Sequence, residues 1–165
     1  MVGLPNMEAK GIESVVEQAE TLTAFYGVWP DFHDAEVIKL HLWRGYVYPG
    51  DWDDRNVFPV LTAKILVLEA TQPGATGTEK NVLVTLRFHD VDAIRLQDFN
   101  HNNSIVGVCV SEQPRGHFTT GEPLPPSLRV TFEQGFGLGA SFGCSRIEVV
   151  NAEWAPAGSL GQPRP

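Results

Sequence analysis

Near the N-terminus, apolar residues recur at steps of three and four positions along the chain. This spacing places them on one side of an α-helix, so the pattern predicts an amphipathic helix over residues 12–25. The apolar stripe comprises Ile12, Val15, Val16, Ala19, Leu22 and Phe25. Gly27 and Pro30 follow, and we expect them to end the helix, because glycine accepts a left-handed cap and proline cannot continue the hydrogen-bond ladder.

After Pro30 the apolar period changes to two, which is typical of strands with one buried face. Ile38, Leu40 and Leu42, for example, alternate with Lys39, His41 and Trp43. Similar patterns predict strands over residues 61–67, 82–88, 94–96, 105–110 and 128–132, and a last, bent strand over residues 140–149. The chain should therefore contain about seven strands.

Short connections between these strands indicate antiparallel pairing, because parallel neighbours need crossovers of a dozen or more residues. Residues 71–78 contain glycine and threonine and should form a hairpin turn, whereas residues 113–126 should form an irregular loop. Ser145 and Arg146 interrupt the alternation of the last strand, which predicts a β-bulge. The predicted fold class is α+β and mostly β, with an N-terminal helix packed on an antiparallel sheet or half-barrel. We expect one domain over residues 1–154 and a flexible tail over residues 155–165.

The charge of the chain restricts its partners. Twelve Lys and Arg against 20 Asp and Glu give a formal net charge of −8 in 165 residues. This balance disfavours nucleic acid and anionic membranes and favours a basic partner, although a negative charge also simply keeps a protein soluble. The sequence shows neither a secretory leader nor an apolar run long enough to span a membrane, so we expect a cytoplasmic location. Cys109 and Cys144 lie in apolar strand patterns and should be reduced, buried thiols.

The tripeptide Phe-His-Asp occurs twice, at residues 32–34 and 88–90, and a second carboxylate follows each copy two residues later. Imidazole and carboxylate groups are good ligands for zinc, iron or manganese, so His33, Asp34, His89, Asp90 and His101 form a candidate metal site. The alternative function for the chain is therefore a metal-binding protein or a metal-dependent enzyme that uses these residues. The alternative is structural, since Asp side chains accept backbone bonds in turns and His side chains satisfy buried carbonyls. No complete catalytic or cofactor-binding motif is present, so we expect neither enzymatic activity nor a cofactor.

The predicted loop over residues 44–59 combines aromatic and acidic side chains. They are Tyr46, Tyr48, Asp51, Trp52, Asp53 and Asp54. Aromatic side chains provide a large contact area at small entropic cost, and acids steer a basic partner at long range. This loop is therefore the predicted partner-binding surface, unless its aromatics fold back over the sheet edge and its acids are merely solvated.

The segment from Val28 to Val37 resembles a known family. Its sequence Val-Trp-Pro-Asp-Phe-His-Asp-Ala-Glu-Val follows a helix and precedes a meander containing Leu86-Arg87-Phe88 and residues 96–100, Leu-Gln-Asp-Phe-Asn. In these features the chain resembles the bacterial Immunity protein 50 family over residues 25–150. The resemblance implies a non-catalytic protein of a polymorphic toxin system that binds and neutralises a cognate toxin.

For the segment that carries the resemblance we also expect a structural role. Trp29 and Phe32 would pack the helix onto the sheet, while His33, Asp34 and Glu36 would fix the turn into the first strand. The acidic balance of the chain suits a basic toxin. Homo-oligomerisation through a sheet edge stays open as well.

Overall fold

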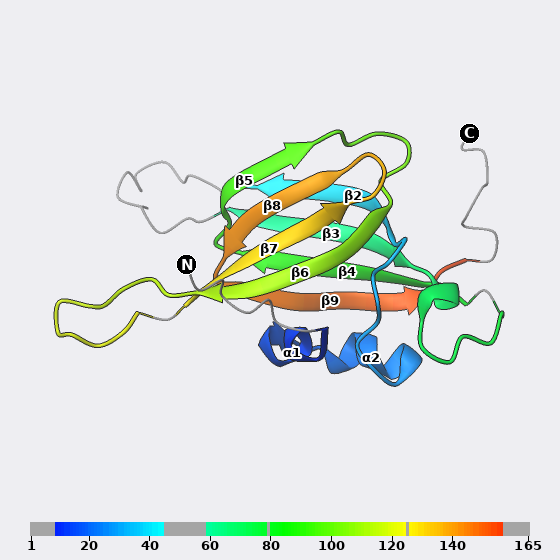
Figure 1. Cartoon of the computed structure of the whole chain (residues 1–165), viewed down its shortest axis with the longest axis horizontal. Coiled ribbons are helices and arrows are strands. Elements are labelled where there is room, and N and C mark those ends of the chain that lie inside the picture. The colour runs from blue at the N-terminus through cyan, green and yellow to red at the C-terminus, as the bar shows by residue number, and fades with distance from the viewer. Residues whose placement is uncertain (1–8, 45–58, 79, 125, 157–165) are drawn as a thin grey trace, which may run out of the picture.

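Two β-sheets pack face to face around a single hydrophobic core in the computed structural model, which describes residues 9–44, 59–78, 80–124 and 126–156 (Figure 1). The larger sheet has the strand order β1 (Val16–Glu17), β9 (Arg146–Trp154), β4 (Val82–His89), β3 (Val60–Val67) and β2 (Glu36–Trp43). The smaller sheet has the order β5 (Asp92–Gln97), β8 (Gly139–Cys144), β7 (Ser127–Gln134) and β6 (Ile105–Gln113). The arrangement is that of a β-sandwich.

Antiparallel pairing dominates both sheets, as the short connections predicted. Among the described strands, only β1 and β9 pair in parallel. The fold class predicted from the sequence, α+β and mostly β, is confirmed. The described residues contain nine strands in two sheets, where the pattern suggested about seven in one sheet or half-barrel.

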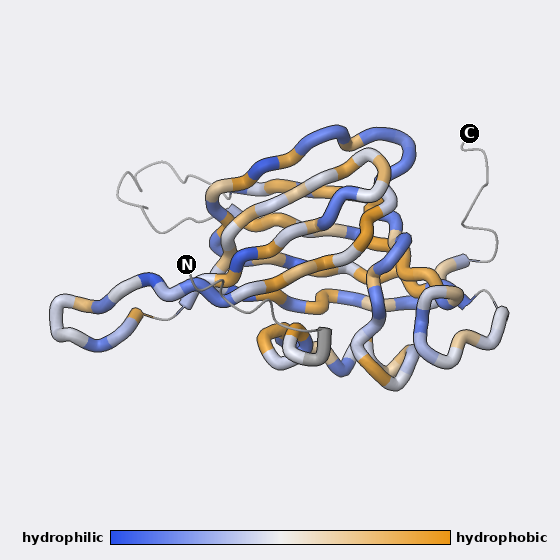
Figure 2. Tube along the Cα trace, in the orientation of Figure 1, coloured by the Kyte–Doolittle hydropathy of each residue, from blue (hydrophilic) through white to orange (hydrophobic). Residues whose placement is uncertain are grey.

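Alternation along the strands explains the core. In β4, residues from Val82 to Phe88 are buried at every second position, and their neighbours are partly exposed. Phe88 reaches from the larger sheet to Phe132 and Phe142 of the smaller one, with ring centroids 6.0 and 4.8 Å away and edge-on geometry. Figure 2 shows hydrophobic residues recurring along the strands and hydrophilic ones in the loop after β5. The cluster formed by Phe88, Phe132 and Phe142 joins the two sheets.

The helix predicted over residues 12–25 is interrupted, and this part of the prediction was wrong. The chain forms α1 (Ala9–Ile12), a 3₁₀ turn η1 (Glu13–Val15), β1, and then α2 (Glu20–Tyr26). Val16 and Glu17 leave the helix because they pair with Ile147 and Glu148 at the edge of the larger sheet. Gly27 ends α2 as expected, with φ of 77° and its N–H donating to the Thr23 carbonyl. No helix in the described ranges is both long and apolar enough to cross a membrane.

The bent last strand is also two strands, so the predicted β-bulge at Ser145 and Arg146 is a corner between sheets. β8 ends at Cys144 in the smaller sheet, and β9 begins at Arg146 in the larger one. The Ser145 N–H donates to the His89 carbonyl at this corner. The alternation breaks there because the chain crosses from one sheet to the other. The predicted turn over residues 71–78 does join β3 to β4, preceded by a second 3₁₀ turn, η2 (Glu69–Thr71).

The two long sides of the sandwich differ. On one side α2 contacts β9 and α1 contacts β6, so the N-terminal segment covers the gap between the sheets (Figure 1). On the other side lie the edge strands β2 and β5, which belong to different sheets. The Val91 N–H donates to the Pro59 carbonyl at one end of this side, and Glu36 bridges to Ser104 at the other.

Candidate functional site

The predicted partner-binding residues Tyr46, Tyr48, Asp51, Trp52, Asp53 and Asp54 lie outside the described residues. The structure does describe where the chain leaves for this segment and returns from it. Leu42 and Trp43, at the end of β2, are 50% and 45% exposed. Large apolar side chains exposed this far are most informative when they gather on one surface. The edge strand β5 of the other sheet also carries an exposed apolar side chain, Leu96.

Apolar side chains of β2 and β5 point into the side of the sandwich that the described helices do not cover. Leu40 and Ile94 are half-buried against the core, while Leu42 and Leu96 are 50% and 45% exposed. Leu42 pairs with buried Leu61, and Leu96 pairs with buried Ala140, so strand alternation directs both toward the space between the sheets. We call Leu40, Leu42, Ile94 and Leu96 the open seam.

The first Phe-His-Asp copy forms the entry into β2. Phe32 is buried and packs beside Trp29, with ring centroids 5.9 Å apart. Asp34 takes a left-handed conformation, φ of 60°, and its N–H donates to the Ile105 carbonyl. The His33 side chain is 55% exposed and lies 3.2 Å from the Asp34 carboxylate, so it does not satisfy a buried carbonyl. The segment thus forms a turn in which the Phe side chain is buried and the Asp backbone is left-handed. Asp tolerates this left-handed conformation better than most residues.

The second copy repeats this geometry after β4. Phe88 is buried, Asp90 has φ of 55°, and Val91 returns to the core. His89 Nε2 lies 3.0 Å from Glu148 Oε2, and the Arg146 guanidinium contacts the same ring. The hydrogen bond from His89 is the main cause that lowers the pKa of Glu148 below its ordinary value.

The five candidate metal ligands are not brought together. Glu36, just after the first copy, pairs through Leu66 with Leu83 at the start of β4. His89 lies six residues further along β4, about 20 Å away at the rise of a strand. His101 lines a hollow with Glu36 and Phe99, so it lies at the same end of the larger sheet as the first Phe-His-Asp copy. Within the described part of the chain there is no group of three or more His, Cys, Asp or Glu side chains arranged to hold a metal.

Neither thiol is suited to nucleophilic chemistry. Both cysteines are free; burial raises the pKa of Cys144 to about 12. Burial, followed by the nearby Glu133 carboxylate, also raises the pKa of Cys109. Cys144 borders a hollow with Asp90, Asp92 and Arg115, but a thiol of such high pKa carries almost no thiolate at neutral pH.

The loop before β6 is held to the start of β2 by hydrogen bonds that involve Asn side chains. Asn103 is 3% exposed; its Oδ1 accepts from the Asn100 N–H at 2.8 Å, and its Nδ2 donates to the Asn100 carbonyl at 2.7 Å. The Asn103 carbonyl accepts the Val37 N–H at the start of β2. No role was assigned to Asn103 from the sequence, although three Asn within residues 100–103, followed by Ser104 before a strand, are a signal for such a turn.

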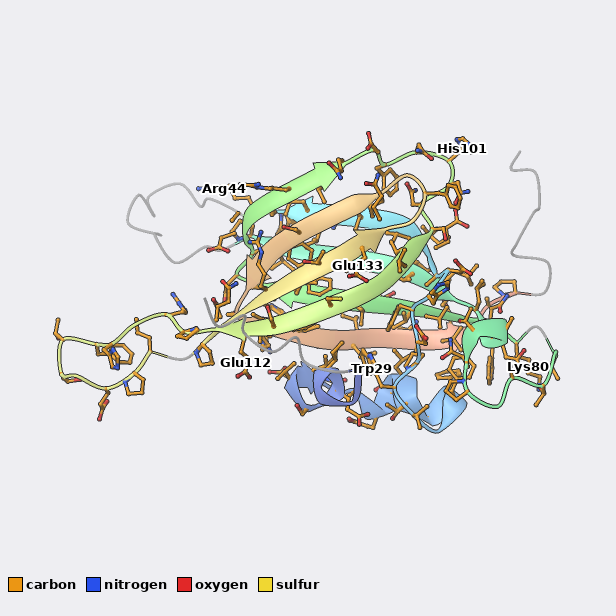
Figure 3. All side chains as sticks on the ribbon, viewed as in Figure 1. Trp29, Arg44, Lys80, His101, Glu112 and Glu133 are labelled. Atoms are coloured by element: carbon orange, nitrogen blue, oxygen red, sulfur yellow. The ribbon has the colours of Figure 1, made fainter. Side chains whose placement is uncertain are left out.

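A further hollow, which the sequence did not predict, lies beside Lys80, at the end of the molecule opposite Arg44 (Figure 3). Phe25 and Tyr26 of α2, Trp154 of β9, and Glu69 of η2 line it together with Lys80. Glu69 follows an apolar strand directly, and nothing in its local pattern predicts that its carboxylate is buried.

The fold and these surfaces define a two-sheet α+β protein in which the described residues leave an apolar seam exposed and form no cluster of His, Cys, Asp or Glu side chains that could hold a metal. No family model, curated protein or solved structure matches the chain.

Proposed function

We propose that this protein is a non-catalytic immunity protein, which binds a cognate bacterial toxin in the cytoplasm and neutralises it. The proposal rests on the resemblance of residues 25–150 to the Immunity protein 50 family. It is supported by the way the described side chains are used: His89 is held by Glu148 and Arg146, and both Asp residues of the repeated tripeptide form turns. Binding requires no catalytic group.

The observation that carries the proposed contact surface is the exposure of Leu42 at the end of β2, shortly before the aromatic and acidic segment. A binding surface needs apolar anchors near its centre and polar groups around them. Leu42 and Leu96 of the open seam provide exposed apolar surface. Residues 46–54 add Tyr46, Tyr48 and Trp52, which are close in the sequence to three Asp residues. The proposed toxin-binding surface therefore combines the open seam with this segment.

The charge of the chain favours a basic toxin. A net charge of −8 attracts a basic partner at long range and accelerates association, more strongly at low salt than at high salt. Asp51, Asp53 and Asp54 place three of these charges on the proposed surface. The same balance makes nucleic acid and anionic lipid poor partners.

The test is to identify the toxin and then show neutralisation. The tagged protein is used to capture partners from its native bacterium, and each captured protein is expressed alone and together with this chain in a host that lacks both. The proposal predicts a captured protein that stops growth alone and is harmless in co-expression. If every captured protein is harmless alone, or if co-expression gives no protection, the immunity function is rejected.

A further inference from the structure

The hollow beside Trp154 is built from three segments that are distant in the sequence. It has a volume of about 300 Å³, and its walls come from the end of α2, the connection between β3 and β4, and the last residue of β9. These elements meet at one end of the sandwich in Figure 1, and Figure 3 places Lys80 there, opposite Arg44. The hollow therefore lies at the opposite end of the sandwich from Arg44, the last described residue before the predicted partner-binding segment.

One wall of the hollow is aromatic. The Phe25 ring meets the Trp154 ring edge-on with centroids 4.8 Å apart, and Tyr26 approaches it at 6.3 Å. These contacts hold the indole in place, yet Trp154 stays 49% exposed. The Lys80 ammonium already lies 5.9 Å from the centre of the indole ring. The face of a tryptophan attracts cations through its quadrupole, so this wall suits a positively charged group.

The floor of the hollow carries a buried carboxylate that lacks a full set of partners. Glu69 is only 6% exposed. Its Oε1 accepts from the Thr76 N–H at 2.6 Å and from the Thr76 hydroxyl at 3.2 Å, whereas Oε2 is closed to solvent and has no hydrogen-bond partner. A buried charge with an unsatisfied oxygen is costly. A water molecule could donate to Oε2, but it would leave the negative charge uncompensated.

We propose that this hollow binds an organic cation, the guanidinium or ammonium group of a ligand, between the Trp154 ring and the Glu69 carboxylate. The cation supplies a positive countercharge for the Glu69 carboxylate, and a small movement of the Glu69 side chain turns Oε2 toward the cation as an acceptor. The field of Glu69 already reaches the aromatic wall: burial first, and then the Glu69 charge, raise the pKa of Tyr26 to about 12. The proposal holds whether or not the protein neutralises a toxin.

Lys80 acts as an internal competitor in this arrangement. Its ammonium occupies the face of Trp154 without forming an ion pair to Glu69 among the described contacts. Replacing Lys80 with glutamine removes a like charge from the hollow and frees the indole face. The Lys80→Gln variant should therefore bind an added cation more tightly than the wild type, a change that a purely structural role for the hollow would not produce.

The experiment is a titration of ¹⁵N-labelled protein with Nα-acetyl-arginine amide, followed by NMR. The neutral isostere Nα-acetyl-citrulline amide is the matched ligand control. We expect saturable shifts at the Trp154 indole and at the amides of Phe25 and Thr76, with a dissociation constant on the order of millimolar, and no saturation with the citrulline compound. Methylguanidinium and the peptide Gly-Gly-Arg-Gly-Gly distinguish the source: tighter binding of the first indicates a free small cation, and tighter binding of the second indicates a protein side chain.

Two variants keep the test decisive. Glu69→Gln keeps an acceptor for Thr76 but removes the charge, and Trp154→Leu removes the aromatic face; each should weaken binding at least about tenfold. Trp43→Leu, at the opposite end, is the matched control and should bind as the wild type does. The proposal is overturned if neither wild type nor Lys80→Gln shows saturable shifts up to about 100 mM probe, a concentration that would detect even very weak binding. It is equally overturned if citrulline binds as well as arginine, or if folded Glu69→Gln and Trp154→Leu proteins bind unchanged.

Discussion

The two long sides of the sandwich differ in how they shield the gap between the sheets from water. At each side, apolar side chains in this gap would be exposed unless another part of the chain covered them. On the helical side the chain covers this gap itself: Leu22 of α2 is fully buried, and Ile12 and Val16 are 6% and 7% exposed. On the opposite side, Leu42 and Leu96 of the open seam remain about half exposed.

This difference separates stability from binding. Side chains sealed by α2 contribute to the free energy of folding, because unfolding returns their full area to water. Exposed side chains of the open seam contribute little to folding and are free to lose area to a partner. A side of the molecule that the described chain does not cover is thus the better place to look for a partner than the side it covers.

The largest expected effect is on the covered side. Leu22→Ala removes a fully buried side chain from the core and should lower the free energy of unfolding by about 2–5 kcal/mol. The matched change on the open side, Leu42→Ala, should lower it by less than about 0.5 kcal/mol. Urea denaturation of both variants checks this. Equal losses would show that the two sides are not different in the way described.

The next effect concerns the polar fastening of the open side. Asn103→Ala leaves the Asn100 N–H and carbonyl without their side-chain partner and should cost about 1–3 kcal/mol of stability. Asn102→Ala, at an exposed neighbour, is the control and should cost less. Hydrogen exchange should also accelerate at Val37, whose N–H donates to the Asn103 carbonyl. Unchanged exchange at Val37 would mean that Asn103 does not fasten β2.

A smaller effect is the acid sensitivity of the covered side, where Arg146 links His89 to Glu17 of β1. The pKa of Glu148 is lower in the folded protein, so its contribution to stability is present above the unfolded pKa and is lost as pH falls through the folded value. His89→Ala removes the main cause of that shift. As the pH falls from about 5 to 3, through and below the ordinary pKa of a Glu carboxyl, the stability of the His89→Ala variant should fall less steeply than that of the wild type. Parallel slopes would contradict this role of His89.

The smallest expected effect is that of added metal. His33 and Asp34 lie at one end of the larger sheet and His89 and Asp90 at the other, so no shared site should gain stability from a bound ion. Adding zinc or manganese should leave the melting temperature unchanged, and elemental analysis should find no stoichiometric metal. A tightly bound metal, or a rise in melting temperature of several degrees, would instead restore the metal-binding alternative.

Local patterns predicted the local features well. The period of two located β3, β4, β6 and β7, and Gly27 correctly marked the end of α2. The interruption at Val16 was not predictable, because an apolar stripe looks the same whether it is one helix or a helix and a short edge strand. Only the pairing of Val16 with Ile147, 131 positions later, decides between them. The corner at Ser145 likewise depends on which sheet each flanking strand joins.

The candidate sites divide in the same way. The repeated Phe-His-Asp segments were visible in the sequence, but whether they converge depends on strand order, which the sequence did not determine. The hollow beside Trp154 combines Phe25, Glu69 and Trp154, and three separate segments must fold before they meet. The sequence predicted a partner-binding loop after β2, but the period of two placed Leu42 on a buried face, and its exposure was not predicted.

The central claim is that the toxin binds at the open seam and the adjacent acidic segment. Its most direct test is the affinity of the captured toxin for a variant in which Asp51, Asp53 and Asp54 are changed to Lys, combined with Leu42→Ser. The control changes Glu13, Glu112 and Glu122 to Lys, which alters the net charge equally at exposed positions elsewhere. We predict that the first variant binds at least about 100-fold more weakly and no longer protects cells, while the control loses mainly association rate. Equal affinities of the two variants for the toxin would contradict the claim.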